Sequence, residues 1–376
     1  MKPLSLYIHV PFCVQKCAYC DFASWPGRER QWRRYFDALM TEIRHWSVIT
    51  DFGRLSGQYC VQTAFIGGGT PTAVDAGYIK EIIDQSRFLT TFADDAEITL
   101  EGNPGTLTPE KLATYKRAGV TRLSLGAQSF DDGLLRSLGR IHTAEQIGEA
   151  VRMARDAGFS NINLDLMYGL PGQTMAQWAD TLEQAVALGV QHISAYSLIV
   201  EEGTPMADRV QRGEAVLPDD ETVNAMQRAC IDILGKADFG RYEISNYAKP
   251  GFQCRHNLVY WNRGDYLGLG CAAHSLMQEH RFHNADTLEE YLSGGRMLDM
   301  ERLTARDRVE ETVMLSTRTT RGLDLGRFYA NYGLRFPAMP ELDGLIEIQG
   351  GFLRLTTRGL EVQNAVVLKL LEVLEK

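Results

Sequence analysis

The chain contains, near its start, the apolar stretch Leu4-Ser5-Leu6-Tyr7-Ile8-His9-Val10, and three cysteines follow it in Cys-x3-Cys-x2-Cys spacing: Cys13, Cys17 and Cys20. A short apolar run of this kind predicts a buried β-strand. Three closely spaced thiolates can each bind one iron of a [4Fe–4S] cluster and leave the fourth iron without a protein ligand. An open position is more typical of a catalytic metal centre than of a structural one. The stretch therefore predicts an open iron–sulfur site just after a strand.

Two other interpretations of the triplet are a zinc site and ordinary core cysteines. A structural zinc ion needs a fourth ligand at ligand spacing, but Asp21 and Phe22 follow Cys20. The pattern of an electron-transfer ferredoxin, Cys-x2-Cys-x2-Cys-x3-Cys-Pro, is not found in the sequence. The other cysteines are too scattered to complete the set by spacing: Cys60, Cys230, Cys254 and Cys271. An open-site cluster is the preferred interpretation.

Length and composition describe an ordinary globular protein. The 376 residues predict one large domain and a smaller one, and 44% hydrophobic with 23% charged residues is a usual balance. The sequence shows no run of eighteen apolar residues and no signal-peptide pattern, so we expect no transmembrane segment. Because the thiols must stay reduced, we expect a cytoplasmic protein. A net charge of −9 argues against nucleic-acid binding.

Six short apolar runs, each followed by a helical pattern, organise the first part of the chain: Leu4–Val10, Tyr59–Gly67, Glu97–Gly102, Arg122–Ala127, Asn161–Gly169 and His192–Val200. Thr143 with Gln146, and Thr174 with Gln177, fit capping boxes at two of the helix starts. Alternating strands and helices predict a parallel sheet in the α/β class. Six such units predict a partial (β/α)6 barrel whose ligands bind at the carboxyl ends of the strands.

The pattern changes after the sixth unit. Residues 218–236 predict a helix, and a loop-rich segment follows from 241 to 283. We assign residues 1–285 to the barrel with this segment, and 286–376 to a smaller C-terminal domain. In that domain two helices, a hairpin turning at Gly350-Gly351 and a final helix are similar to a winged-helix module.

Polar residues follow several predicted strands. Gly67-Gly68-Gly69-Thr70-Pro71 can expose backbone N–H groups to a ligand, although a tight turn without a ligand explains it equally well. Glu101 and Gln128 end the third and fourth strands, and Asp165 lies within the fifth. A salt bridge to Arg140 is the structural alternative for Asp165. Together, one polar residue per strand end predicts a small polar ligand lying across the sheet.

These motifs resemble those of the radical SAM superfamily, and more narrowly its coproporphyrinogen oxidase-like branch. The resemblance rests on the segment from Tyr7 to Cys20, the Gly-Gly-Gly-Thr-Pro loop, Glu101-Gly102-Asn103-Pro104 and the run from Tyr168 to Thr174, and it covers nearly the whole chain. It implies a [4Fe–4S] cluster whose open iron is chelated by S-adenosylmethionine. An electron from the reduced cluster then cleaves the sulfonium to a 5′-deoxyadenosyl radical.

The resemblance also implies roles for single residues. Cys13, Cys17 and Cys20 match the cluster ligands. Ile199, expected on the sixth strand, is an apolar backing for the adenine. Ten positions in all match those around S-adenosylmethionine or a second copy of it: Tyr7, Tyr19, Gly68, Gly69, Thr70, Glu101, Gln128, Arg140, Asp165 and Ile199.

A second motif separates two branches of the superfamily. His256-Asn257-Leu258-Val259-Tyr260-Trp261 looks like the His-Asn-x-x-Tyr-Trp signature of HemW-type heme chaperones. Oxygen-independent coproporphyrinogen III oxidases carry a further cysteine two residues after the triplet, where this chain has Phe22. The oxidases also have an N-terminal extension before the first strand, whereas only six residues precede Tyr7 here. The signature implies heme binding, with His256 as iron ligand and Tyr260 and Trp261 as stacking surface.

From spacing alone, the alternative is that His256 and Asn257 pin a loop by hydrogen bonds, with Tyr260 and Trp261 as core aromatics. The ligand atom for heme iron also stays open. The other candidates in this part of the chain are Cys254, His274, His280 and His283.

The resulting hypothesis is a heme chaperone that binds the cluster, S-adenosylmethionine and heme, and transfers heme to acceptor hemoproteins. An electron donor for the cluster is a further expected partner, and a transient visit to a membrane surface is compatible with the sequence. The alternatives are an oxygen-independent coproporphyrinogen III oxidase, which decarboxylates two propionates, and a radical SAM enzyme with another substrate. Whether S-adenosylmethionine is cleaved on a substrate stays open.

Overall fold

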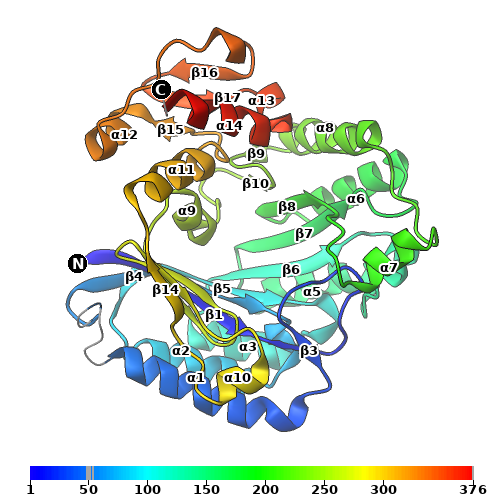
Figure 1. Ribbon diagram of the computed structural model, residues 1–376. Helices are drawn as coiled ribbons and strands as arrows, with labels where there is room; N and C mark the ends of the chain where they lie inside the picture. The colour runs from blue at the N-terminus through cyan, green and yellow to red at the C-terminus, as the bar shows by residue number, and fades with distance from the viewer. Residues whose placement is uncertain (48–51, 53–54, 375–376) are drawn as a thin grey trace.

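A parallel sheet forms the centre of the computed structural model, which describes residues 1–47, 52 and 55–374. Its six parallel strands lie side by side in sequence order (Figure 1): β1 (Lys2–Val10), β4 (Tyr59–Gly68), β5 (Thr91–Gly102), β6 (Arg122–Gln128), β7 (Ile162–Tyr168) and β8 (His192–Ser197). The predicted partial (β/α)6 barrel is confirmed. All six carboxyl ends point to one edge, because every pairing among them is parallel.

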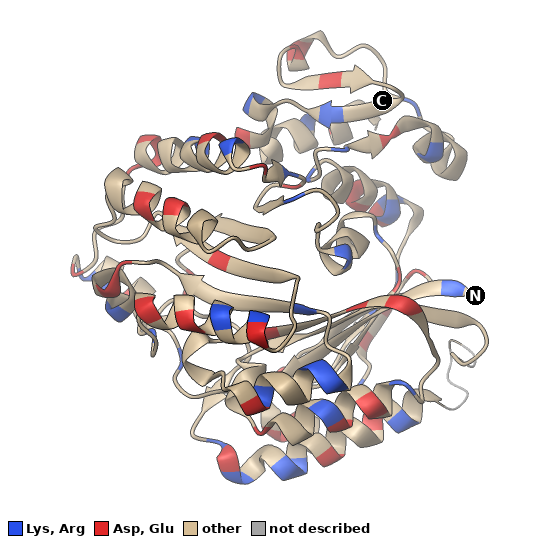
Figure 2. Cartoon of the chain, turned by 180° about the vertical axis from the view of Figure 1, so that it is seen from behind, with Lys and Arg blue, Asp and Glu red and all other residues tan. Residues whose placement is uncertain are grey.

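Helices cover the outer side of this sheet (Figure 1). They are α1 (Trp32–Ser47), α2 (Ala76–Ser86), α3 (Pro109–Ala118), α5 (Ala144–Asp156) and α6 (Met175–Ala187). In α1, the side chains of Phe36, Leu39 and Ile43 recur at helical spacing and are fully buried against the sheet. In Figure 2, acidic and basic residues alternate with uncharged ones along the outer helices. The hydrophobic pattern therefore sets which face of each helix meets the core.

The two predicted capping boxes are present. Thr143 and Gln146 form the first, at the start of α5. In the second, the Thr174 hydroxyl accepts a hydrogen bond from the backbone N–H of Gln177 at 3.2 Å, and the Gln177 side chain accepts one from the Thr174 N–H at 2.9 Å. Each box satisfies two backbone donors that the first helical turn leaves free.

We expect Thr174→Ala to lower the free energy of unfolding by about 1 kcal/mol, because one backbone donor of α6 loses its acceptor. Equilibrium denaturation with urea measures the change. Thr174→Ser keeps the hydroxyl and serves as the matched control, so it should remain close to wild type. Equal destabilisation by both substitutions would show that the cap is not the cause.

The segment predicted to be loop-rich, 241–283, contains regular structure. The short helix α9 (Arg255–Trp261) precedes β11 (Tyr266–Leu269), which pairs parallel to β1. Strands β12 (His274–Met277), β13 (His280–His283) and β14 (Leu298–Arg302) then extend this edge of the sheet in antiparallel order. At the opposite edge, β10 (Asn246–Ala248) and β9 (Gly240–Arg241) follow β8. The strands were missed because each has only two to five residues.

Two further helices connect β8 to this segment, α7 (Pro205–Gln211) and α8 (Asp220–Lys236). The helix predicted over 218–236 is confirmed as α8. The side chain of Asp219, just before this helix, accepts a hydrogen bond from the N–H of Thr222 at 2.8 Å and so caps the helix start.

The C-terminal elements have a hydrophobic core of their own. They are α11 (Ala305–Ser316), β15 (Leu323–Asp324), α12 (Leu325–Tyr332), the hairpin of β16 (Ile346–Gln349) and β17 (Phe352–Leu355), α13 (Thr357–Glu361) and α14 (Gln363–Leu374). Gly350 and Gly351 both have positive φ, +59° and +83°, as the predicted two-residue hairpin turn requires. Helix α10 (Leu288–Leu292) contacts α1, and β14 pairs with the large sheet. Both lie within the predicted range 286–376 but pack with the barrel.

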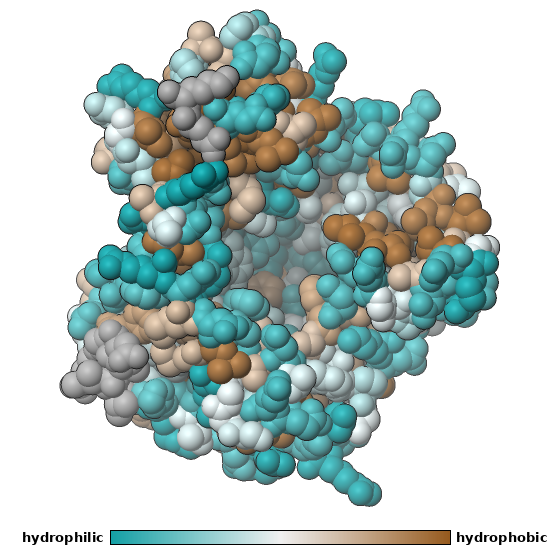
Figure 3. Space-filling model, viewed as in Figure 1, coloured by the Kyte–Doolittle hydropathy of each residue, from teal (hydrophilic) through white to brown (hydrophobic). Residues whose placement is uncertain are grey.

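Figure 3 shows the surface hollowed between the C-terminal elements and the barrel. Exposed apolar residues lie in the stretch between β8 and α8, with Val216 74% exposed. No helix in the described part of the chain has the length and apolar character needed to cross a membrane.

Candidate cofactor pocket

Backbone hydrogen bonds hold the loop that carries the three cysteines. After β1, the short strand β2 (Phe12–Cys13) pairs parallel with β3 (Trp25–Pro26), and this closes the loop at its base. At its tip, the N–H of Ala18 donates to the carbonyl of Leu138 at 2.9 Å, in the turn that precedes α5. The Ala18 and Tyr19 side chains pack on a small apolar cluster that includes Leu138. The loop is thereby held at the carboxyl ends of β1 and β6.

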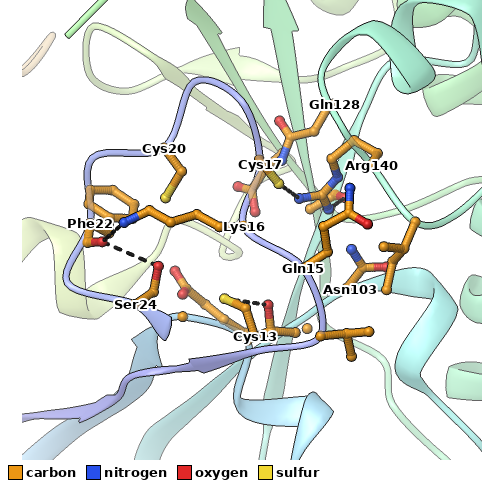
Figure 4. A pocket seen from close by; sticks show the side chains of 18 of the residues that line it. Cys13, Gln15, Lys16, Cys17, Cys20, Phe22, Ser24, Asn103, Gln128 and Arg140 are labelled. Atoms are coloured by element: carbon orange, nitrogen blue, oxygen red, sulfur yellow. Dashed lines mark hydrogen bonds between the residues drawn. The ribbon is translucent and has the colours of Figure 1, made fainter. Parts of the chain in front are cut away.

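The three thiols face one pocket (Figure 4). All are free, with Cys13 accepting from the Thr70 hydroxyl at 3.5 Å and Cys17 from Arg140 Nη1 at 3.3 Å. The three Sγ atoms do not all lie within 4.8 Å of one another. Four tetrahedral Zn–S bonds would bring the sulfurs to roughly 3.8 Å. The three thiols as placed therefore do not converge on one ion.

The glycines of the loop after β4 allow its backbone to pack closely on β1 and β2. A Cβ atom on Gly69 would lie 2.7 Å from the carbonyl oxygen of Phe12, and one on Gly68, where φ is +106°, would overlap the His9 ring. The N–H of Gly69 donates to the carbonyl of Val10 at 2.9 Å. Any side chain here would push the loop away from the pocket, so the glycines are required by close approach.

Glu101, at the end of β5, lies beside this glycine loop. Its Oε2 accepts a hydrogen bond from the Gly68 N–H at 3.1 Å. Burial and, second, the nearby Asp165 raise the pKa of Glu101 to about 7. A buried carboxylate near its pKa at neutral pH is suited to accept hydrogen bonds from a cationic group.

Asp165 lies in the middle of β7, level with Gly126 of β6 and Ser194 of β8. Its carboxylate accepts from the Asn163 amide at 2.7 Å and from the Ser124 hydroxyl at 3.2 Å. Burial raises the pKa of Asp165, and these hydrogen bonds oppose the shift. The alternative of a salt bridge to Arg140 is wrong for the described residues, because hydrogen bonds to neutral groups hold the carboxylate instead.

Arg140 enters the pocket from the turn before α5. Its guanidinium donates to the Cys17 thiol and to the carbonyl of Gly126, yet its buried Nε has no partner among the described residues. Across the pocket, Gln128 has a positive φ of 66° and its amide oxygen accepts from the Tyr196 hydroxyl at 2.9 Å. A buried guanidinium donor without an acceptor fits an anionic ligand such as a carboxylate.

The pocket encloses about 900 Å³ of space, part of it open to solvent. It brings together most of the positions that the superfamily resemblance assigned to S-adenosylmethionine: Tyr19, Gly68, Gly69, Thr70, Glu101, Gln128, Arg140 and Asp165. With three free thiols, two carboxylates and one unpaired guanidinium donor, the residues present fit a [4Fe–4S] cluster with an amino-acid moiety on its open iron.

Tyr7 and Ile199 lie elsewhere. Tyr7 is on β1, its hydroxyl forms a hydrogen bond with Nδ1 of His9 at 2.9 Å, and it lines an adjoining pocket. The expectation that Ile199 lies on the sixth strand is wrong. Strand β8 ends at Ser197, and Ile199 is 67% exposed and does not line the cofactor pocket. Its apolar neighbours Leu198 and Val200 made the predicted strand longer than the segment that pairs with β7.

Comparison with known proteins identifies the family. Residues 7–185 match the model of the radical SAM superfamily, and residues 303–362 match the HemN C-terminal domain. A heme chaperone HemW from Bacillus subtilis is 37% identical over 347 residues, 91% of this chain and 88% of the relative. The chain belongs to the HemW family. A HemW of Mycobacterium tuberculosis is 37% identical over 98% of this chain and 95% of its own length, and that of Escherichia coli is 42% identical over 73% and 70%.

The fold agrees with this family. The structure of coproporphyrinogen III oxidase (HemN) from Escherichia coli, described as a radical SAM enzyme, superposes with a TM-score of 0.83. The match has 25% sequence identity and covers 98% of this chain and 89% of that chain. Membership of the radical SAM superfamily implies a [4Fe–4S] cluster and S-adenosylmethionine.

The signature segment of HemW-type chaperones forms α9. His256 is 1% exposed, and its two ring nitrogens form hydrogen bonds with the Thr63 hydroxyl at 2.8 Å and the Tyr260 hydroxyl at 2.9 Å. Its ring stacks on Phe65 with centroids 5.2 Å apart. Burial and, second, Arg122 lower the pKa of His256 to about 3, so the imidazole is neutral. To bind heme iron, this side chain would have to give up one of its hydrogen bonds.

The other residues of the segment differ in position. Tyr260 lines the pocket that adjoins the cofactor pocket. Trp261 faces the C-terminal elements, with the Arg318 guanidinium 4.7 Å from its ring centroid. Asn257 is half-buried and has its backbone near the Cys254 thiol. Of the four residues of the signature, Tyr260 is the one that lines this adjoining pocket.

Several pocket residues were missed by sequence reasoning. They line the same cavity as the cysteines: Gln15, Lys16, Ser24, Asn103, Thr106, Ser124, Gly126 and Tyr196. A signal existed for two of them, because residues at every second position of a strand share one face. Ser124 and Gly126 precede Gln128 at this spacing on β6.

Proposed function

We propose that this protein binds a [4Fe–4S] cluster through Cys13, Cys17 and Cys20, holds S-adenosylmethionine on the open iron, and binds heme for transfer to acceptor hemoproteins. The observation that carries the proposal is the convergence of three free thiols with an unpaired Arg140 donor and the Glu101 carboxylate in one pocket. The names of the relatives support the heme part. The cytoplasm would suit this protein, because it keeps the three cluster-binding thiols reduced.

Side chains of the pocket supply complementary contacts for the amino-acid part of S-adenosylmethionine. Glu101 accepts from the amino group, Arg140 donates to the carboxylate, and the backbone of Gly68 and Gly69 lies against the ligand. When bound and reduced, the cluster supplies the electron for cleavage of the sulfonium. Tyr19 and Gln128 limit the space around the ligand, because both are part of the pocket wall.

A specific observation keeps coproporphyrinogen III oxidation as the second candidate. The whole-chain structural likeness to the oxidase from Escherichia coli supports this candidate, because the two chains share the same fold. Against it stands Phe22, which occupies the position of the oxidases' additional cysteine and lines the cofactor pocket.

One pair of assays on anaerobically reconstituted protein separates the two functions. Titration with hemin should give stoichiometric binding with a sharpened heme absorption band. The same preparation, given coproporphyrinogen III, S-adenosylmethionine and dithionite, should form no protoporphyrinogen at enzymatic rates. Failure to bind hemin would refute the chaperone function, and rapid protoporphyrinogen formation would establish the oxidase instead.

A further inference from the structure

A second pocket adjoins the cofactor pocket. Three residues line both, Phe22, Gly68 and Glu101, so the two cavities share one wall. The remaining lining of the second pocket is largely aromatic or small: Tyr7, His9, Ala23, Tyr260, Tyr266, Ala272 and His274. Its space amounts to about 840 Å³, part of it open to solvent. A cavity of this size with aromatic walls is suited to a large planar ligand.

Among the eight histidines of the chain, His274 differs in its hydrogen bonding. Five histidines have partners for both ring nitrogens: His9, His142, His192, His256 and His283. His280 forms a hydrogen bond through Nδ1 with the carbonyl of Gln278. His45 is exposed in the last turn of the outer helix α1. His274 makes no side-chain hydrogen bond to any described residue.

His274 also has the position and the state of an available ligand. It begins β12, is exposed, and lines the second pocket. Its ring stacks on His283 with centroids 5.0 Å apart and 18° between the planes, which fixes its orientation. Partial burial and, second, the neighbouring His283 lower the pKa of His274. A neutral imidazole with a free nitrogen is a usual axial ligand for heme iron.

The walls of the pocket complement a porphyrin. Tyr260 and Tyr266 meet edge to face with ring centroids 4.8 Å apart and 89° between the planes, so one of the two rings can stack on a bound porphyrin while the other holds it in place from the side. Phe22 is 63% exposed and lines both pockets. An exposed phenylalanine beside a cavity offers apolar area that a bound ring would cover.

We propose that the second pocket is the heme site of this protein, with His274 as the axial ligand of the iron, one ring of the Tyr260–Tyr266 pair as the stacking surface, and Phe22 as the wall between heme and S-adenosylmethionine. The proposal rests on the heme binding proposed above. It gives His256 a positioning role, because that imidazole holds the Tyr260 hydroxyl at 2.9 Å.

The test is a hemin titration of the reconstituted protein, followed by absorption spectroscopy. His274→Ala should weaken hemin binding at least tenfold, and His274→Cys should bind hemin with a shifted Soret band, because a thiolate replaces the imidazole. His45→Ala, on the outer helix, is the matched control and should titrate as wild type. Iron content and S-adenosylmethionine binding, measured on every variant, show that the barrel is intact.

The outcomes separate this inference from the proposed function. If wild-type protein binds no hemin, the proposed function itself fails. If wild type binds hemin and both His274 variants keep its affinity and Soret position, the function stands and the assignment of His274 is overturned. Loss of affinity in His274→Ala together with a shifted band in His274→Cys supports the assignment.

Discussion

Cys20→Ser is expected to abolish the brown colour and the cluster iron of anaerobically reconstituted protein. Three thiolates are the minimum set that can hold three irons of a [4Fe–4S] cluster, and Cys20 has no replacement in the pocket. Burial raises the pKa of Cys20 and of Cys13, so both are protonated thiols before the metal binds. A serine hydroxyl is a much weaker ligand for iron. Iron and sulfide analysis with visible absorption measures the loss.

Cys60→Ser is the matched control for this variant. Cys60 is also a free, partly exposed thiol, but it lies at the start of β4, whereas the cofactor pocket lies at the end of that strand. The Cys60 variant should keep wild-type iron content and colour. Persistence of the cluster in Cys20→Ser, or its loss in both variants, would contradict the assignment of the ligands.

The barrel could be predicted because each of its strands contains an apolar run that is largely buried. β7, for example, has six buried or nearly buried residues around the single carboxylate Asp165. The edge strands could not be predicted in the same way. β12 and β13 have four residues each and contain polar side chains, so neither periodicity nor length distinguishes them from loops.

The pocket residues that belong to a sequence motif could be predicted. Those that come together only through the register between strands could not. Glu101 stands level with Ser124, and Gly126 stands level with Asp165. Such neighbours come from pairing between strands that lie far apart in sequence, so one strand's pattern does not show them. The same limit applies to histidines, since the sequence shows His256 within a motif but not that both its nitrogens are hydrogen-bonded.

Glu101→Gln is expected to stabilise the cluster-free protein at pH 8 and to weaken S-adenosylmethionine binding. The folded-state pKa of Glu101 is about 7, raised from 4.5 by burial first and by Asp165 second. The folded state therefore binds the proton more tightly than the unfolded state. The resulting destabilisation is absent below pH 4.5, grows between pH 4.5 and 7, and is complete above it.

A neutral glutamine removes that cost, so the free energy of unfolding at pH 8 should rise by up to about 3 kcal/mol. Its side-chain oxygen can still accept from the Gly68 N–H. Binding should suffer, because a charge-assisted hydrogen bond to the amino group of S-adenosylmethionine becomes a neutral one, a loss of about 1.5 kcal/mol or roughly tenfold in affinity. Urea denaturation and equilibrium dialysis measure the two effects.

The pH dependence distinguishes this explanation from a general packing effect. The gain in stability of Glu101→Gln over wild type should fall towards zero as the pH is lowered from 8 to 4.5, because the wild-type carboxyl is then protonated in both states. Glu183→Gln, on the exposed face of α6, changes the net charge equally and should alter neither stability nor binding. A gain that stays constant with pH would show that burial of the Glu101 charge is not its cause, and unchanged binding would remove Glu101 from the site.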